Sequence, residues 1–133
     1  MSKTQTKILI VDDEPDMCWA LQHILENLKI QSTTAFSGVQ ALTLMASNVF
    51  RLAFVDAKLP DIEGLDLAEK LRNLDPEINI IMVSGYFYND DAAIKNALKE
   101  GIINGFVSKP FLHHEICEIA QNLEHTITCS GME

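Results

Sequence analysis

The strongest constraint on the fold is a unit that recurs five times along the chain: a short apolar run followed by a segment with apolar residues at helical spacing. The first run, residues 7–11, is apolar from Ile8 onward and stops at Asp12. An unbroken run of this kind is typical of a strand that is buried on both faces. Strands that alternate with helices are joined by right-handed crossovers, so we predict a parallel sheet covered by helices on both faces.

The predicted strands are short, and a predicted helix follows each of them. The strands cover residues 7–11, 31–36, 51–55, 78–83 and 105–108. Pro15 and Ser37 favour the start of a helix, and Gly101 favours the end of one. The fold class is therefore α/β, with a doubly wound five-stranded parallel sheet and five helices. We expect one domain over residues 1–124 and a polar C-terminal tail over residues 125–133.

Length and composition restrict the class of protein. The 133 residues, of which 47% are apolar, suffice for one sizeable core but not for two ordinary domains. The start of the chain lacks the apolar centre of a secretory signal, and no apolar run approaches the roughly 20 residues of a membrane span. Three widely spaced cysteines favour a reducing compartment, so we expect a cytoplasmic protein without membrane contact. A net charge of −9 without a basic cluster disfavours direct binding to nucleic acid.

One group of potential metal ligands lies near the C-terminus. Cys117 follows His113 and His114 at helical spacing, so two of these side chains can meet on one helical turn. Zinc sites usually have four ligands, and the sequence nearby offers no more of them. We therefore expect a half-buried thiol and surface histidines here.

Charged and polar residues follow four of the five predicted strands. Asp12 and Asp13 close the first strand, Asp56 the third, Ser84 the fourth and Lys109 the fifth. Because the carboxyl ends of parallel strands meet at one edge of a sheet, these side chains are expected to share a crevice. Three carboxylates in one crevice repel each other, and Mg²⁺, which prefers oxygen ligands, relieves that repulsion. Each residue alone is weak evidence, because acidic residues often cap helices, but their joint placement is specific.

At this point the chain resembles the receiver domains of two-component signalling, in the style of the chemotaxis response regulator. The resemblance covers residues 7–124 and implies the flavodoxin-like (βα)5 fold with strand order 2-1-3-4-5. The sequence departs from the commonest pattern of the family in having Leu59 for Met, Ser84 for Thr and Phe106 for Tyr. The motifs that carry the resemblance are Val11-Asp12-Asp13-Glu14-Pro15, Val55-Asp56 with Leu59-Pro60 and Gly64, Val83-Ser84-Gly85, and Phe106-Val107-Ser108-Lys109-Pro110.

The resemblance implies a signalling domain and not an enzyme. Asp56 would be the nucleophile that takes a phosphoryl group from the phosphohistidine of a sensor histidine kinase or phosphotransfer protein. Asp13 would bind Mg²⁺ directly and Asp12 largely through water, and Asp56 and the backbone carbonyl of Lys58 would complete the ligand set. The Lys109 ammonium and the Ser84 hydroxyl would contact the transferred group.

The resemblance also implies an output. When Ser84 moves toward the phosphoryl group, Phe106 would turn inward and alter the face formed by the fourth helix, fifth strand and fifth helix, over residues 90–123. We expect an effector protein to bind there, beside Ala93, Ile94 and Ala97, and homodimerisation on activation is left open. A separate hypothesis is that the Lys58 ammonium bridges to Glu14 and slows loss of the phosphoryl group.

Several other interpretations share the fold. A flavin carrier would need a hydroxyl- and glycine-rich first loop, whereas residues 12–16 are acidic. A magnesium-dependent phosphatase with an aspartyl nucleophile usually has two Asp residues two positions apart, whereas here residue 14 is Glu. A scaffold that is not phosphorylated is disfavoured because all the site residues are present. The chain is either a stand-alone receiver or the N-terminal receiver fragment of a larger transcription regulator.

Overall fold

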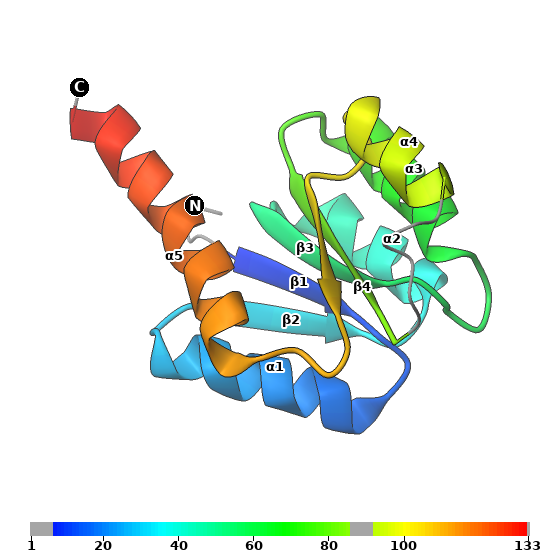
Figure 1. The fold of residues 1–133 in the computed structure, drawn as a ribbon, viewed down its shortest axis with the longest axis horizontal. Coiled ribbons are helices and arrows are strands. Elements are labelled where there is room, and N and C mark those ends of the chain that lie inside the picture. The colour runs from blue at the N-terminus through cyan, green and yellow to red at the C-terminus, as the bar shows by residue number, and fades with distance from the viewer. Residues whose placement is uncertain (1–6, 86–91, 133) are drawn as a thin grey trace.

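The computed structural model describes residues 7–85 and 92–132, and side chains as far as residue 122 (Figure 1). Over these residues strands and helices alternate strictly. The strands are β1 (Lys7–Val11), β2 (Gln31–Ala35), β3 (Leu52–Asp56), β4 (Asn79–Ser84) and β5 (Gly105–Ser108). The helices are α1 (Pro15–Asn27), α2 (Gly38–Ser47), α3 (Gly64–Leu74), α4 (Ala92–Lys99) and α5 (His113–Met132). None of these helices is both long enough and apolar enough to cross a lipid bilayer.

All strand pairs are parallel, and the order is β2-β1-β3-β4-β5, which confirms the predicted sheet. The chain leaves β1 toward β2 on one side and later returns to β3 on the other side of β1. The strand order therefore reverses between β1 and β3, where Val11 pairs with Val55. The residues that follow this pair, Asp12 and Asp56, come to lie next to each other at the carboxyl end of the sheet.

The helices cover the two faces of the sheet unequally. On one face, Ile8 and Ile10 of β1 pack with buried residues of α1 and α5. On the other face, Leu9 and Val11 pack with buried residues of α2, α3 and α4. Figure 1 shows α1 and α5 together on one side of the sheet. Alternate residues of each central strand thus enter different cores, which accounts for the unbroken apolar runs in the sequence.

Local sequence signals explain where the helices begin and end. Pro15 is the first residue of α1, and the Ser37 hydroxyl accepts a hydrogen bond from the Gln40 N–H at the start of α2. Gly101, just after α4, has a positive φ of 78°, which glycine adopts without steric cost. These three signals were predicted from the sequence and are confirmed.

The structure corrects the predicted exposure of α4. Ile94 and Ala97, expected on the partner surface, are only 3% and 4% exposed because the apolar stripe of α4 faces the core.

The backbone of α5 continues to Met132, whereas a frayed tail was expected from residue 125. No Pro or Gly interrupts the sequence between His113 and Gly131, so the helix has no early stop signal. The division into a domain and a tail at residue 124 stays a prediction.

An arginine at the end of α3 ties three segments together at the amino edge of the sheet. The Arg72 guanidinium donates hydrogen bonds to the carbonyl oxygens of Pro76 and Ile78, before β4. It also donates to the Ile102 carbonyl at 3.1 Å and to Asn104 Oδ1 at 2.8 Å, before β5. The planar fork of arginine suits several acceptors at once, so Arg72 fixes α3 against the segments that lead into β4 and β5.

Replacing Arg72 by lysine should therefore lower the free energy of unfolding by about 1.5–3 kcal/mol, the value of hydrogen bonds to charged groups. Lysine keeps the charge but cannot reach four acceptors. Arg51→Lys is the matched control because Arg51 is exposed, and its effect should stay within about 0.5 kcal/mol. Urea unfolding of both variants measures the difference, and equal losses would show that the Arg72 contacts do not stabilise the fold.

Candidate functional site

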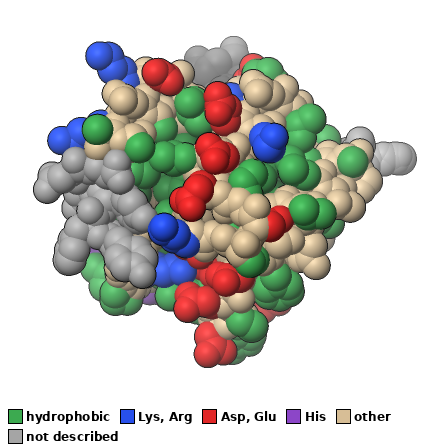
Figure 2. Space-filling view, turned by 90° about the vertical axis from the view of Figure 1, so that its right-hand side faces the viewer, with side chains coloured by type: hydrophobic (Ala, Val, Ile, Leu, Met, Phe, Trp, Pro, Cys, Tyr) green, Lys and Arg blue, Asp and Glu red, His purple; other side chains and the backbone are tan. Residues whose placement is uncertain are grey.

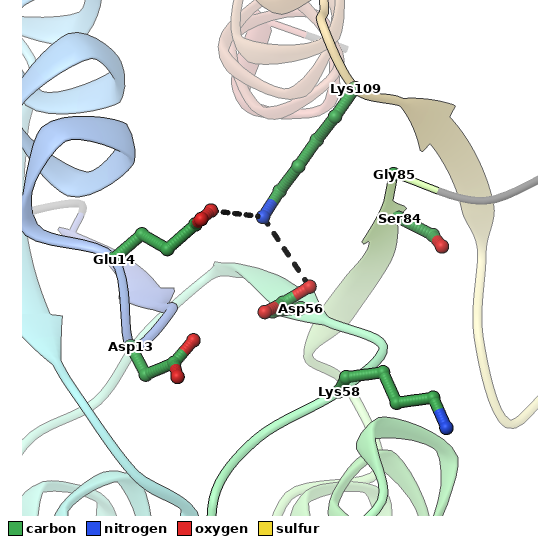
Figure 3. Close-up of a pocket in the computed structure, with 7 residues that line it drawn as sticks. All are labelled: Asp13, Glu14, Asp56, Lys58, Ser84, Gly85 and Lys109. Atoms are coloured by element: carbon green, nitrogen blue, oxygen red, sulfur yellow. Dashed lines mark hydrogen bonds and ion pairs between the residues drawn. The ribbon is translucent and has the colours of Figure 1, made fainter.

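The ends of four strands converge on one open pocket. Figure 3 shows the seven residues that line it, which are Asp13, Glu14, Asp56, Lys58, Ser84, Gly85 and Lys109. Asp13 and Lys109 follow β1 and β5, and Asp56 and Ser84 are the last residues of β3 and β4. The predicted convergence of these four residues is thus confirmed. Figure 2 shows acidic side chains gathered across this side of the molecule, with basic side chains among them.

Asp12, Asp13 and Asp56 form a compact acidic group. Each offers a carboxylate oxygen, and the three oxygens lie within 4.8 Å of one another. Asp12 and Asp56 are 3% and 7% exposed, whereas Asp13 is open to solvent. An all-oxygen donor set of three carboxylates, reachable from solvent on one side, suits a hard divalent cation such as Mg²⁺.

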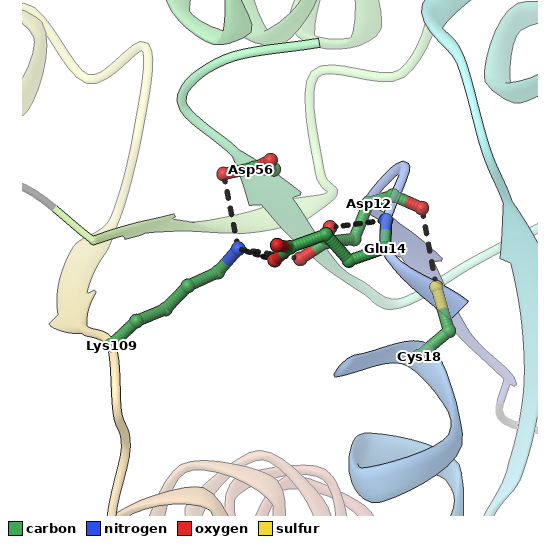
Figure 4. Close-up of polar contacts among 5 residues, drawn as sticks. All are labelled: Asp12, Glu14, Cys18, Asp56 and Lys109. Carbon is green, nitrogen blue, oxygen red and sulfur yellow. Dashed lines mark hydrogen bonds and ion pairs between the residues drawn. The ribbon is translucent and has the colours of Figure 1, made fainter. Parts of the chain in front are cut away.

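Two hydrogen bonds from residues just after β1 hold Asp12 in place, as Figure 4 shows. Its Oδ1 accepts a hydrogen bond from the Glu14 N–H at 2.9 Å, and its carbonyl oxygen accepts one from the Cys18 thiol at 3.3 Å. Burial, together with the nearby Asp12 charge, raises the pKa of Cys18 to about 11, so the thiol keeps its proton and remains a donor.

Lys109 supplies positive charge to the pocket. Its ammonium lies 3.0 Å from Asp12, 3.1 Å from Glu14 and 3.5 Å from Asp56. Burial alone would lower the pKa of Lys109, but its hydrogen bonds to Asp12 and Glu14 outweigh this and raise the pKa above its usual value. The side chain therefore stays an ammonium, placed against the acidic group.

The Asp56 carboxyl is less acidic than an exposed aspartate. Burial, and next the charge of Asp12, raise its pKa to about 6, although Lys109 and the backbone N–H of Lys58 act in the opposite direction. This N–H, two residues past Asp56, donates a hydrogen bond to the carboxylate. The Lys58 carbonyl as a metal ligand stays a prediction.

Two contacts hold the loop between β3 and α3. Gly64 lies so close to β3 that a Cβ atom would stand 2.3 Å from the Asp56 carbonyl oxygen, so only glycine fits. Asp61 reaches across to α2, where its two carboxylate oxygens accept the N–H groups of Gly38 at 2.9 Å and Val39 at 3.0 Å. These hydrogen bonds, the one from Gly38 first, lower the pKa of Asp61. The sequence analysis missed the role of Asp61, because the contact joins residues 22 or more positions apart.

Ser84 and Phe106 lie on the same face of the sheet. Ser84 is buried at the end of β4, and Figure 3 shows its hydroxyl directed away from Asp56. Phe106 of β5 pairs with Met82 and packs, half-buried, against the core beneath α4. Side chains two residues apart on a strand share a face, so Met82, Ser84 and Phe106 do so here. The switch role of Phe106 stays a prediction.

The structure contradicts the hypothesis that Lys58 bridges to Glu14. Glu14 contacts the Lys109 ammonium instead, and Figure 3 shows the Lys58 side chain on the other side of Asp56. The reason is topological. The loops that carry Glu14 and Lys109 lead into α1 and α5, which cover the same face of the sheet, whereas the loop with Lys58 leads into α3 on the opposite face.

The histidine and cysteine pair of α5 meets as expected. Cys117 Sγ lies 3.5 Å from His113 Nδ1, one helical turn away. Within the part of the chain that the structure describes, the group of three or more ligand-type side chains close enough to share an ion is the acidic one around Asp56.

Comparison with known proteins identifies the family to which the sequence is similar. A family model described as "Response regulator receiver domain" matches residues 8–121. The chain is 36% identical over 107 residues to the response regulator protein PilR of Pseudomonas aeruginosa, covering 80% of this chain and 23% of PilR. It is 33% identical over 122 residues to the nitrogen assimilation regulatory protein NtrX of Azorhizobium caulinodans, covering 90% of this chain and 26% of NtrX. It therefore spans about a quarter of the length of these relatives.

Solved structures of response regulators have the same fold as this chain. A CheY-like response regulator receiver domain protein from Methanospirillum hungatei superimposes with a TM-score of 0.83 at 30% identity, covering 94% of this chain and 98% of that one. The response regulator TrrA of Thermotoga maritima, solved in complex with Mg²⁺ and BeF, superimposes with a TM-score of 0.77 at 28% identity, covering 90% of this chain and 99% of TrrA.

The raised pKa of Asp56 makes the stability of the metal-free protein depend on pH. Between the unfolded pKa of about 3.9 and the folded pKa of about 6, the native state holds a proton that the unfolded chain has lost. The contribution of Asp56 is thus fully present below about pH 4 and is lost as the pH rises through 6.

Relative to Asp56→Asn, which cannot ionise, the metal-free wild type should lose stability between about pH 4 and pH 6. Urea unfolding of both proteins in chelator, at several pH values, measures the difference. A stability difference between the two proteins that is independent of pH, or a wild type that gains stability relative to Asp56→Asn as the pH rises, would contradict the raised pKa.

Proposed function

This chain belongs to the response regulator receiver domain family, and from that premise we propose that its Asp56 carboxylate accepts a phosphoryl group from the phosphohistidine of a sensor histidine kinase or phosphotransfer protein. The observation that carries the proposal is the position of the Lys109 ammonium, 3.5 Å from Asp56 Oδ1 and beside three carboxylates that suit a divalent cation. Phosphoryl transfer requires mainly positioning and charge neutralisation, which this arrangement supplies.

In the proposed reaction an Asp56 oxygen attacks phosphorus, the bond from phosphorus to the donor imidazole nitrogen breaks, and its electron pair stays on that nitrogen. Asp12, Asp13 and Asp56 would hold Mg²⁺, with the Lys58 carbonyl as a further ligand. When bound, Mg²⁺ neutralises charge on the phosphoryl oxygens. Lys109 stays an ammonium and stabilises the same oxygens, and the Ser84 hydroxyl donates a hydrogen bond to the transferred group. In this proposal the chain is itself the acceptor of the group, so we regard it as a signalling domain and not as an enzyme.

The output surface proposed here is the face of α4, β5 and α5. Residues 90 and 91, at one end of it, lie outside the described residues. With Ile94 and Ala97 buried, the exposed side of α4 carries Ala93, Lys95 and Leu98, the last 41% exposed. A mixture of charge and apolar area of this kind suits reversible contact with an effector protein or a second receiver.

The relatives are much longer than this chain. The chain matches about a quarter of PilR and of NtrX, which supports the alternative that it is the N-terminal receiver fragment of a larger transcription regulator. In either setting we propose a cytoplasmic protein. The net charge of −9 argues against direct contact of this domain with nucleic acid.

Mg²⁺ should stabilise the fold because it relieves repulsion among Asp12, Asp13 and Asp56. At ten times its dissociation constant a ligand adds about 1.4 kcal/mol by mass action, which a thermal melt detects. Asp13→Asn should abolish the shift, and Asp16→Asn, an exposed carboxylate outside the group, should preserve it. An unchanged melting temperature of the wild type in saturating Mg²⁺ would count against the metal site.

Acetyl phosphate with Mg²⁺ should add one phosphoryl group to the wild type and none to Asp56→Asn, because the amide has no nucleophilic oxygen anion. Lys109→Ala should accept the group more slowly. Intact mass measurement over time gives both results. Phosphorylation of Asp56→Asn to the wild-type extent would place the acceptor elsewhere.

A further inference from the structure

Glu14 is a carboxylate that the proposed reaction does not use, yet it contacts the lysine on which that reaction depends. Its Oε1 lies 3.1 Å from the Lys109 ammonium, although the two residues are 95 positions apart in the chain. The Glu14 side chain is 61% exposed, whereas that of Lys109 is 13% exposed. Glu14 therefore reaches inward from the rim of the pocket to a lysine that is mostly covered.

The main chain of Glu14 keeps this contact in place. Its N–H donates to Asp12 Oδ1 at 2.9 Å, and Pro15, the first residue of α1, follows it. The same Asp12 carboxylate contacts Lys109 through Oδ2 at 3.0 Å. The Glu14 N–H and the Lys109 ammonium thus contact the two different oxygens of one buried carboxylate. Figure 4 shows the Glu14 side chain reaching back to the Lys109 ammonium.

The three contacts of Lys109 differ in length. The ammonium lies closer to Asp12 and Glu14, at 3.0 and 3.1 Å, than to Asp56, at 3.5 Å. Figure 3 shows it between Glu14 and Asp56. Because attraction between charges falls with distance, a partner on the far side reduces the positive charge that Lys109 presents to Asp56 and to a phosphoryl group arriving there.

We propose that Glu14 is a positioning residue that restrains Lys109 in the unphosphorylated domain and thereby slows phosphorylation of Asp56. This inference rests on the proposed function and adds a means of setting the rate at the same site. When the phosphoryl group forms its bond to Asp56, Lys109 moves toward it and its contact with Glu14 weakens. The loss of that contact is part of the barrier.

The exposure of Glu14 limits the size of the effect. Ion pairs with an exposed partner are commonly worth between about 0 and 1 kcal/mol, because water screens them. Removing the Glu14 charge should therefore raise the rate of phosphorylation about two- to fivefold, which corresponds to about 0.4–1 kcal/mol. An increase in rate cannot come from a damaged fold, so this readout separates positioning from a merely structural role.

The test is the rate at which acetyl phosphate modifies the full chain in saturating Mg²⁺ at fixed ionic strength, followed by intact mass. Glu14→Gln should react about two- to fivefold faster than the wild type. Asp16→Asn is the matched control: it removes one negative charge from the first turn of the same helix, at an exposed side chain that makes no contact with Lys109. Asp16→Asn should react within about 1.5-fold of the wild-type rate, because distant exposed charges are screened.

The Glu14→Gln change is also made in a Lys109→Ala background, at a higher donor concentration. The double variant should react within about 1.5-fold of the Lys109→Ala rate, because the contact between Glu14 and Lys109 is already gone. An unchanged or slower rate in Glu14→Gln, an equal gain in Asp16→Asn, or a full gain without Lys109 would each overturn the proposal. All of these outcomes leave the acceptor role intact as long as Asp56→Asn takes up no phosphoryl group.

Discussion

Repulsion among the carboxylates at the carboxyl ends of β1 and β3 is the constraint on which the rest of the site depends. Asp12, Asp13 and Asp56 offer oxygens within 4.8 Å of one another, and Lys109 is the ammonium placed among them. One positive charge does not balance three negative ones. Burial, and next the charge of Asp12, raise the pKa of Asp56 in spite of Lys109. In the proposed function a divalent cation would complete the balance and keep Asp56 ionised. A phosphoryl group on Asp56 would then face the cation and the Lys109 ammonium, and not the carboxylates alone.

The fold supports this arrangement by placing its connections on different faces of the sheet. The reversal of strand order brings the ends of β1 and β3 together. The helices that follow β1 and β5 share one face, which brings Glu14 to Lys109. The loop after β3 turns to the opposite face, where Gly64 allows close packing on Asp56 and Asp61 fastens the loop to α2. The loop that contains Lys58 is thus anchored from both sides.

Much of this could be predicted from the sequence because strongly patterned segments decide it. Apolar runs, and β-branched residues in the case of β2, predicted all five strands, and β1 and β5 have the expected bounds. The residues after the runs predicted the pocket, since parallel strands end at one edge. Contacts between long polar side chains could not be predicted: Glu14 could reach Lys58 or Lys109, and only the face on which each loop continues decides between them. Ile94 and Ala97 were assigned to the surface, although their helical spacing places them in the core.

The central claim is that the phosphoryl group is carried by the Asp56 carboxylate as an acyl phosphate. Borohydride reduces an acyl phosphate to an alcohol, so it leaves a permanent mark at the modified residue. Peptide mapping of the wild-type chain, after treatment with acetyl phosphate and Mg²⁺ and then with borohydride, identifies that residue. We expect aspartate to be converted to homoserine at position 56 and at no other acidic residue. Conversion at Asp12 or Asp13 in place of Asp56, or phosphate retained on a histidine, would contradict the account.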